Sequence, residues 1–446
     1  MKRFIHGVML TLFFSVNAFA LEPVKAGAFA AEAPVNHEGP PAWQFKLSGD
    51  ERFRVEYKKD FDFNESKKDN GSQFYHRLRL GLGAGLTDEQ RNPELDIFVE
   101  GLDAQTGGHH IKANAGQTDD FDLHQAFVNV YNILGSDIGI KAGRQELNYG
   151  EGRLVAAPAW SNRMRHFDAG VIRYRHSGFY ADALYGQDVK YDDDKFNRSR
   201  NEEILGGLYA GYQRDKTAPL IETYFFSLID IKGTNDIHRH TIGAHLKRSI
   251  AAGAVIDIEI PYQFGKTGTT TAGTKDIEAY ALHIDVSKSW SKTKWKPKFS
   301  FSYDEASGDR DPNDSANNTF VPLYQSTHGP YGQLDFFRWQ NVRNPELSLT
   351  LSPTEKFRFT PQLDFFWLQS KSDSWYNSSG AAFRTQTGGD RNYYAGSEAS
   401  LRFNYDFTKN LKFETGCAHF FTGGYTKDTG ADDDSDWVYS QVNIKY

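Results

Sequence analysis

The chain has little of what stabilises or anchors many proteins. Its 446 residues include a single cysteine, so no intramolecular disulfide holds the fold. After the first twenty residues, no apolar run approaches the roughly 18 residues that a membrane-spanning helix needs. The 51 lysines and arginines are outnumbered by 58 aspartates and glutamates, and the formal net charge of −7 argues against a nucleic-acid-binding protein.

The first twenty residues have the organisation of a secretory signal peptide. Lys2 and Arg3 precede an apolar run over 7–16, and Ala-Phe-Ala at 18–20 provides the small-residue pattern of a cleavage site. We therefore expect cleavage before Leu21. The mature chain is then exported from the cytoplasm.

What the chain has in abundance is aromatic residues, at 15%, and glycine, at 40 residues. Apolar and polar residues alternate along it: the segment RFRVEY at 52–57 puts three apolar side chains on one face of a strand and three charged side chains on the other. The same alternation recurs at 75–83, 93–101, 253–262, 278–288 and 356–368. This period of two predicts an all-β protein.

Alternating strands fit a soluble β-sandwich as well as a membrane barrel, and the connections distinguish the two. Short turns are expected at 88–92, 133–136, 175–177, 214–218, 250–252, 289–292, 353–355 and 407–410. Longer polar loops fall between them, at 58–72, 105–120, 147–164, 190–202, 231–237, 265–275, 305–340, 371–391 and 424–434. Short connections at one end and long ones at the other are typical of outer-membrane barrels.

The sequence therefore predicts a transmembrane antiparallel β-barrel of about 18 strands, with short periplasmic turns and long extracellular loops. We divide the chain into a signal peptide (1–20), a periplasmic N-terminal extension (21–43) and the barrel (44–446). The final segment, WVYSQVNIKY at 437–446, alternates and ends on an aromatic residue. It resembles the closing strand by which the barrel-assembly machinery recognises its clients. Outer-membrane lipid and lipopolysaccharide are expected to surround the barrel of a Gram-negative cell.

One segment carries a specific resemblance. Between 143 and 169 the chain contains Gly143-Arg144-Gln145, Leu147, Tyr149-Gly150, Arg153-Leu154-Val155, Trp160, Asn162, Arg165 and Phe167-Asp168-Ala169. These residues, with RLRLG at 77–81 and the segment 396–416, resemble the alginate export family of outer-membrane barrels. The resemblance implies a channel for an anionic polysaccharide, with an arginine-lined constriction shielded by an inward loop and a periplasmic turn. It also implies periplasmic export partners.

The strand alternation predicts which charged side chains face the lumen. The cations are Arg52, Arg54, Arg77, Arg79, Lys247, Lys296, Lys298, Arg358 and Arg402, and the acids are Glu56, Asp96, Glu100, Asp257, Glu259, Asp285, Asp364 and Glu398. Arg77 and Arg79 are the least ordinary, because Gly81 and Gly83 beside them leave room for a sugar chain. We expect Arg358 and Arg402 to face them across the pore.

Arg144 is a difficult case. Counted from Ile138 and Ile140, it falls on the apolar face and reaches the lumen only if the strand bulges near Gly143. Otherwise its side chain extends to the lipid headgroups. The candidate substrate-binding residues are Arg77, Arg79, Arg144, Arg153, Asp168, Arg358, Arg402 and Glu398, although for any one of them a salt bridge that braces the wall is the alternative.

No metal or cofactor is expected. The acidic runs at 191–195, 304–314 and 428–436 have the oxygen ligands to bind Ca²⁺ or to bridge lipopolysaccharide through divalent ions, but solvated loops are the better interpretation. The chain lacks the GxSxG, HExxH and GxxxxGK[ST] motifs, so a barrel enzyme is the least favoured hypothesis. Two others remain. One is an export channel for an anionic polysaccharide or oligosaccharide such as alginate, and the other is an uptake porin for small anions or sugars.

Overall fold

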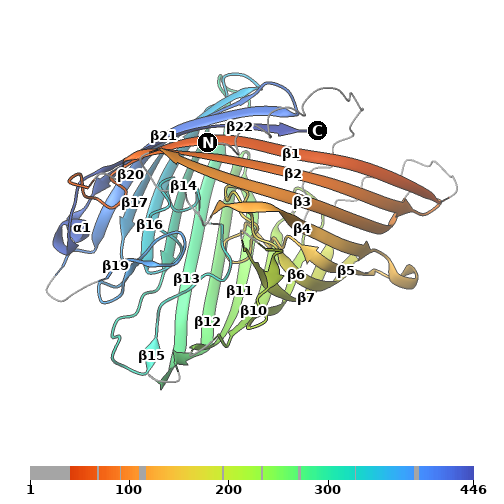
Figure 1. Cartoon of the computed structure of the whole chain (residues 1–446), viewed down its shortest axis with the longest axis horizontal. Coiled ribbons are helices and arrows are strands. Elements are labelled where there is room, and N and C mark those ends of the chain that lie inside the picture. Colours follow the sequence, from red (N-terminus) through yellow and green to blue (C-terminus); the bar gives the residue numbers. More distant parts are fainter. Residues whose placement is uncertain are drawn as a thin grey trace.

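The computed structural model describes residues 41–67, 70–90, 92–109, 117–192, 195–232, 235–269, 273–326, 328–385 and 391–446, so the expected signal peptide and residues 21–40 of the extension lie outside the described residues. Eighteen antiparallel strands form a closed barrel (Figure 1). They are β1 (Ala42–Lys59), β2 (Gly71–Thr87), β3 (Pro93–His109), β4 (Asp119–Val130), β5 (Ile138–Gln145), β6 (Phe167–His176), β7 (Phe179–Lys190), β9 (Glu203–Tyr212), β10 (Leu220–Asp230), β11 (Asn235–Ala251), β12 (Ala254–Thr269), β13 (Gly273–Ser289), β14 (Lys298–Ala306), β16 (Val342–Thr350), β17 (Phe357–Trp367), β20 (Tyr394–Asp406), β21 (Leu411–Thr422) and β22 (Ser435–Lys445).

The first and last strands close the barrel. β1 pairs with β2 on one side and with β22 on the other. At the seam, Gly49 N donates to Tyr446 O at 2.7 Å and Tyr446 N donates to Gly49 O at 3.1 Å. The ring of Tyr446 lies over Gly49, where a Cβ atom would come within 2.1 Å of it. Glycine at position 49 therefore leaves the space that the Tyr446 ring occupies, and any larger side chain there would collide with the ring.

The barrel is apolar outside and polar inside. On β1, Phe53, Val55 and Tyr57 are 38%, 48% and 43% exposed, whereas Arg52 and Arg54 are each 2% exposed. This arrangement confirms the predicted alternation and is the reverse of a soluble sandwich, since an apolar outer wall suits hydrocarbon. Among the described residues, no helix is long and apolar enough to cross a membrane; the short α1 spans Gly424–Thr429.

The predicted turns coincide with the eight short connections at one end of the barrel. Two details of the prediction are wrong. The loop expected over 265–275 is much shorter, because β12 continues to Thr269 and β13 begins at Gly273. Lys296 is not on a lumenal strand face, because it lies in the turn between β13 and β14, at a φ of 41°.

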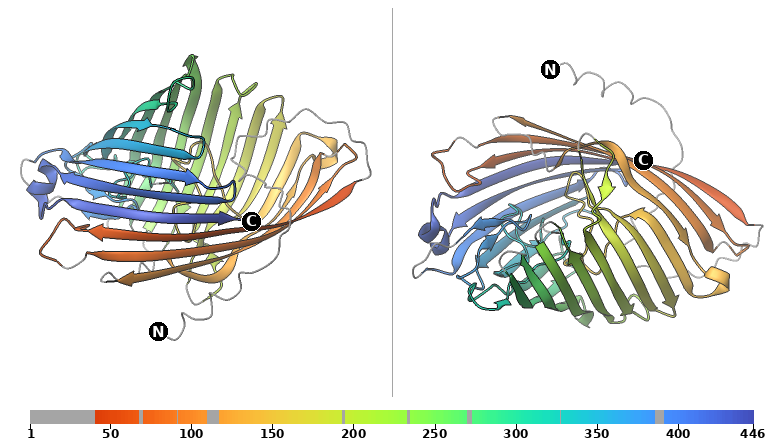
Figure 2. Two further views of the ribbon diagram at one scale, coloured as in Figure 1. Left: turned by 90° about the horizontal axis from the view of Figure 1, so that it is seen from above. Right: turned by 60° about the horizontal axis from the view of Figure 1, so that its bottom comes forward.

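Two long loops fold into the barrel (Figure 2). We call residues 146–166 the first inward loop and residues 307–341 the second. Tyr324 N donates to Leu154 O at 2.7 Å and Ala156 N donates to Tyr324 O at 2.8 Å, so the two loops pair with each other. Their buried apolar side chains are Leu147, Tyr149, Leu154, Val155, Ala156, Ala157, Met164, Phe320, Tyr324, Tyr331, Leu334, Phe336, Phe337 and Trp339.

Short strands occur in three of the long connections, including the second inward loop. β8 (Arg198–Ser199) pairs with β7, and β15 (Ala316–Asn317) runs parallel to part of β13. β18 (Trp375–Tyr376) and β19 (Ala382–Arg384) form a separate hairpin. At this end, Phe63 packs against Phe336 and Trp375 with ring centroids 5.0 and 5.6 Å away, which ties three loops together.

Candidate functional site

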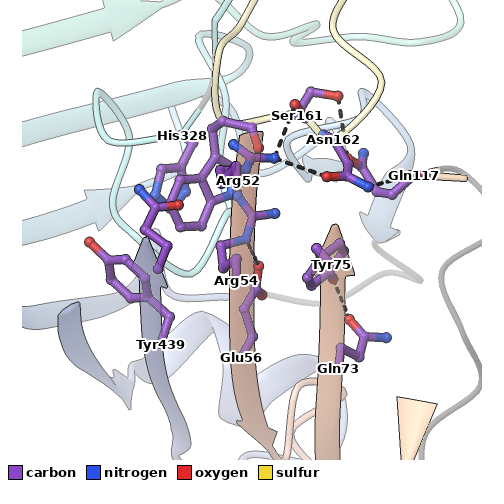
Figure 3. A network of polar contacts seen from close by, with 12 residues as sticks. Arg52, Arg54, Glu56, Gln73, Tyr75, Gln117, Ser161, Asn162, His328 and Tyr439 are labelled. Carbon is purple, nitrogen blue, oxygen red and sulfur yellow. Dashed lines mark hydrogen bonds and ion pairs between the residues drawn. The ribbon is translucent and has the colours of Figure 1, made fainter. Parts of the chain in front are cut away.

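Three arginines of the barrel wall hold the tip of the first inward loop. Arg52 on β1 and Arg77 on β2 both donate to Ala159 O, at 2.8 and 2.9 Å. Arg54 on β1 donates to Trp160 O at 2.8 Å. Figure 3 shows Arg52 and Arg54 pointing from β1 toward the loop. The inward-facing arginines therefore position this loop within the lumen.

Arg79 lies deeper in an ion-pair cluster. Its Nη2 is 2.8 Å from a carboxylate oxygen of Glu100 on β3 and 2.9 Å from one of Glu146 in the first inward loop. His124 on β4 contacts the same Glu146 oxygen at 2.9 Å. Burial raises the pKa of the Glu146 carboxyl, but the charge of Arg79 and the hydrogen bond from His124 outweigh burial and hold it at about 2.

The same cluster contains the described group best suited to a metal ion. Glu100, His124 and Glu146 bring three ligand atoms within 4.8 Å of one another. In this geometry the Arg79 guanidinium donates to both carboxylates. Its positive charge thus compensates both carboxylates.

Arg153 anchors the first inward loop to the opposite wall. It lies 2.9 Å from a carboxylate oxygen of Glu259 and 3.6 Å from one of Asp257, both on β12. Burial lowers its pKa, but the two carboxylates outweigh that effect and raise it above the ordinary arginine value. In the ring of strands, β12 lies on the far side from β1 and β2. The loop therefore spans the lumen between two charged walls.

Arg144 and Asp168 form a two-point ion pair. Arg144 Nε and Nη2 donate to the two Asp168 carboxylate oxygens at 2.8 and 3.0 Å. The two residues are register partners, and the pairing of β5 with β4 and β6 has no shift at Gly143. The bulge that would turn Arg144 inward is thus absent from this described strand. Asn197 O also accepts from Arg144, and Arg144 is only 8% exposed, so the alternative of extension to lipid headgroups is also wrong.

Glu398 on β20 holds the second inward loop. It accepts hydrogen bonds from Gln333 N at 2.6 Å and Leu334 N at 3.3 Å. Gly332, at a φ of 82°, lets the backbone approach, since a Cβ there would lie 2.5 Å from a Glu398 oxygen. Glu398 is 2% exposed, so its carboxylate binds the loop and is not accessible to a solute in the lumen.

Arg358 and Arg402 differ from the other arginines. Arg358 on β17 is exposed and Arg402 on β20 is half-buried, both on the inward face. Within the described ranges, neither has an ion pair. They lie on adjacent strands. Their positions are offset by two residues along the strands, because Arg358 is opposite Asn404 and Arg402 is opposite Thr360. Together they form a patch of two open cations toward the turn end, which we call the open pair.

Two expectations about this region are wrong. Only β21, β22 and β1 separate β20 from β2, so the open pair does not face Arg77 and Arg79 across the pore. The room expected beside Gly81 is filled, because a Cβ there would lie 2.6 Å from Ser48 Oγ and 2.8 Å from the ring of Phe98. Phe98 is an inward residue of β3, which strand alternation does place on this face.

The residues that were missed are aromatic. Tyr75, Trp437 and Tyr439 are inward and nearly fully buried; Trp437 and Tyr439 pack around the Trp160 ring, and the Arg54 guanidinium lies over the Tyr75 ring. Alternation also predicts them to face inward, on the same faces as the charged residues of β2 and β22. The second inward loop was missed as well, and its run of aromatic residues was the available signal.

A closed barrel with an apolar outer wall and charged residues inside defines the class of outer-membrane channels. The model of the family described as alginate export matches residues 44–439, and the chain belongs to this family. No curated protein matches the chain.

Several solved structures share the fold. OccK5 (OpdH) of Pseudomonas aeruginosa is 13% identical, with a TM-score of 0.57 over 90% of this chain and 97% of that one. OpdL of the same organism is 10% identical, with a TM-score of 0.58 over 90% and 98%. OccAB1 of Acinetobacter baumannii is 10% identical, with a TM-score of 0.57 over 90% and 96%. At these identities the likeness shows the barrel fold alone.

Proposed function

We propose that the barrel conducts an anionic polysaccharide of the uronate type, such as alginate, out of the cell across the outer membrane. Membership of the alginate export family supports the choice of polymer. The observation that carries the proposal is the open pair, Arg358 and Arg402, because two inward cations without ion-pair partners lower the free energy of a polyanion in the lumen.

The acids of the neighbouring strands leave the open pair unneutralised. Glu346, Asp364 and Glu398 lie directly opposite one another on β16, β17 and β20, on the inward face. Asp364 and Glu398 are 0% and 2% exposed, and they lie six and four residues along their strands from Arg358 and Arg402. The two cations therefore stay available to a polyanion in the lumen.

A second candidate is uptake of small anions or sugars. The two inward loops favour it, because they occupy part of the lumen and leave less space for a polymer. The two functions differ in their response to chain length. A uronate polymer channel is blocked more strongly by longer oligouronates, whereas a small-solute porin responds to the monomer.

The experiment is a planar-bilayer measurement of reversal potential under a KCl gradient. The wild-type channel is expected to be anion-selective despite the net charge of −7, because permeation responds to the field in the lumen. The double variant Arg358→Gln/Arg402→Gln is expected to lower the anion-to-cation permeability ratio by about threefold.

Arg248→Gln is the matched control, because Arg248 lies on the exposed face of β11 near the turns. It should leave the reversal potential unchanged. A cation-selective wild-type channel, or a double variant that keeps full anion preference and its block by oligomannuronate, would contradict the proposal.

A further inference from the structure

The periplasmic turn between β13 and β14 concentrates positive charge. Residues 286–303 include five lysines and no acidic residue. Lys292, Lys294 and Lys296 belong to the turn itself and are exposed. In the part of the chain that the structure describes, none of these three forms an ion pair. One point of the periplasmic rim therefore carries three cations that no carboxylate neutralises.

Trp295 holds this turn against the lipid-facing side of the wall. Its ring packs edge-on against Phe359, an outward residue of β17, with ring centroids 6.2 Å apart. Its carbonyl oxygen accepts a hydrogen bond from Ser352 N at 2.6 Å. Lys294 Nζ lies 5.6 Å from the centroid of the Trp295 ring. Because Trp295 contacts the outer face, the Lys294 ammonium lies on the membrane side of the turn.

A groove of about 430 Å³ opens on the same outer wall. It crosses β14, β16, β17, β20 and β21, and its lining includes Phe299, Leu349, Pro361, Ala399, Leu401 and Cys417. Pro361 follows Phe359 as the next outward residue of β17. The groove therefore begins beside the residue that Trp295 contacts, and it continues the outer surface of the basic turn.

The groove and the turn match the two parts of a phospholipid. An apolar groove in hydrocarbon accepts an acyl chain, but it does not select one lipid over another, because lipid tails are alike in polarity. Lysines at the level of the headgroups do select, since an ammonium attracts the phosphate of an anionic lipid. A tryptophan between them suits the interface, where its apolar ring meets the hydrocarbon and its polar edge meets the headgroups.

We infer that the groove and residues 292–296 bind one anionic phospholipid of the periplasmic leaflet, with an acyl chain in the groove and the phosphate at Lys294 and Lys296. The position of the site assigns the leaflet, because the short turns mark the periplasmic end of the barrel and the long loops the other end. The site lies outside the lumen. The inference therefore goes beyond the proposed function and is independent of the solute that the barrel conducts.

The first experiment measures the lipid that the purified barrel retains in a neutral detergent, by native mass spectrometry. Phosphatidylglycerol and phosphatidylcholine with identical acyl chains compete for the protein. The wild type is expected to prefer phosphatidylglycerol by about tenfold, because only this lipid has a net negative charge. Lys294→Gln/Lys296→Gln is expected to lower the preference to about twofold.

Arg214→Gln/Lys216→Gln is the matched control. It removes the same two positive charges from another periplasmic turn, between β9 and β10, where Arg214 is 3.0 Å from a carboxylate oxygen of Asp215. This variant should keep the preference of the wild type. The heat-modifiable band checks that every variant is a folded barrel.

A second experiment fills the groove. Ala399→Phe from β20 and Cys417→Phe from β21 each place a ring in it, which removes the contacts of the acyl chain and should lower the affinity for phosphatidylglycerol by about threefold. Ala183→Phe is the control, because Ala183 lies on the outer face of β7 between the exposed Ile172 and Leu208, away from the groove. It should leave the affinity unchanged.

Three outcomes overturn the inference. The first is equal retention of the two lipids by the wild type, and the second is an unaltered preference in Lys294→Gln/Lys296→Gln. The third is full affinity for phosphatidylglycerol in both groove variants. If the lysine variant keeps its lipid preference but is blocked less by oligomannuronate added on the periplasmic side, the turn attracts a polymer at the channel entrance and not a lipid.

Discussion

Two pairs of inward arginines with the same strand alternation have different surroundings. Arg77 and Arg79 on β2 are enclosed by the first inward loop, Asp50, Glu100 and Glu146. The open pair, Arg358 and Arg402, faces the lumen without ion pairs in the described structure. Alternation decides which face a side chain takes, but the loops that fold against that face decide whether it stays available. We therefore expect the first pair to contribute to stability and, under the proposed function, the second pair to contribute to selectivity.

The largest expected effect is on stability. Arg79→Ala leaves Glu100 and Glu146 close together in a buried site without their shared cation, which should cost about 3–5 kcal/mol of the free energy of unfolding. Arg402→Ala, from the open pair, should change it by no more than about 0.5 kcal/mol. Both variants are measured in detergent by the denaturant concentration at which half of the folded, heat-modifiable band is lost. Equal midpoints would remove the distinction between the pairs.

A smaller effect is expected where a carboxylate holds the second inward loop. Glu398→Ala removes the acceptor for Gln333 N and Leu334 N, at a cost of about 1–3 kcal/mol, and Glu398→Gln should restore part of it. Glu355→Ala, in the exposed turn between β16 and β17, is the control in the same denaturation assay. A midpoint for Glu398→Ala that matches the control would show that this loop does not depend on the wall.

The third effect is confined to acid pH. Because the folded pKa of Glu146 is lowered from 4.5 to about 2, its ion pair contributes stability that is fully present above pH 4.5 and is lost as the pH falls toward 2. The stability difference between wild type and Glu146→Gln should therefore shrink over this interval. The difference for Arg402→Ala should show no such trend. Thermal unfolding as a function of pH measures both, and a pH-independent Glu146→Gln difference would contradict the assignment.

Much of the barrel could be predicted from the sequence because its determinants are local. Alternation at 52–57 requires only that one face meets lipid and the other water, and Arg52 and Phe53 follow it. Turns such as 353–355 and 407–410 are likewise set by nearby residues. The family signature at 143–169 also led to the inward loop, through resemblance.

The site was less predictable because its determinants are distant in sequence. Glu398 meets a loop 64 and 65 residues away, and Arg52 meets one more than a hundred residues away. Strand alternation predicts which face of the sheet Arg144 takes. It does not predict that the segment around Asn197 covers the Arg144 side chain. Gly81 indicates space in the sequence, but the ring of Phe98 from the neighbouring strand fills it. Such contacts depend on how loops pack, which periodicity does not encode.

The seam between Gly49 and Tyr446 has a consequence for biogenesis. β1 already pairs with β2, but its other edge has no partner until β22 arrives, and the backbone bonds between Tyr446 and Gly49 extend that pairing by one residue beyond Asp50. A chain that ends early keeps two exposed strand edges, which hydrocarbon does not tolerate. Because the closing pairing joins residues 49–59 to residues 436–446, barrel closure depends on contacts between segments that are far apart in sequence.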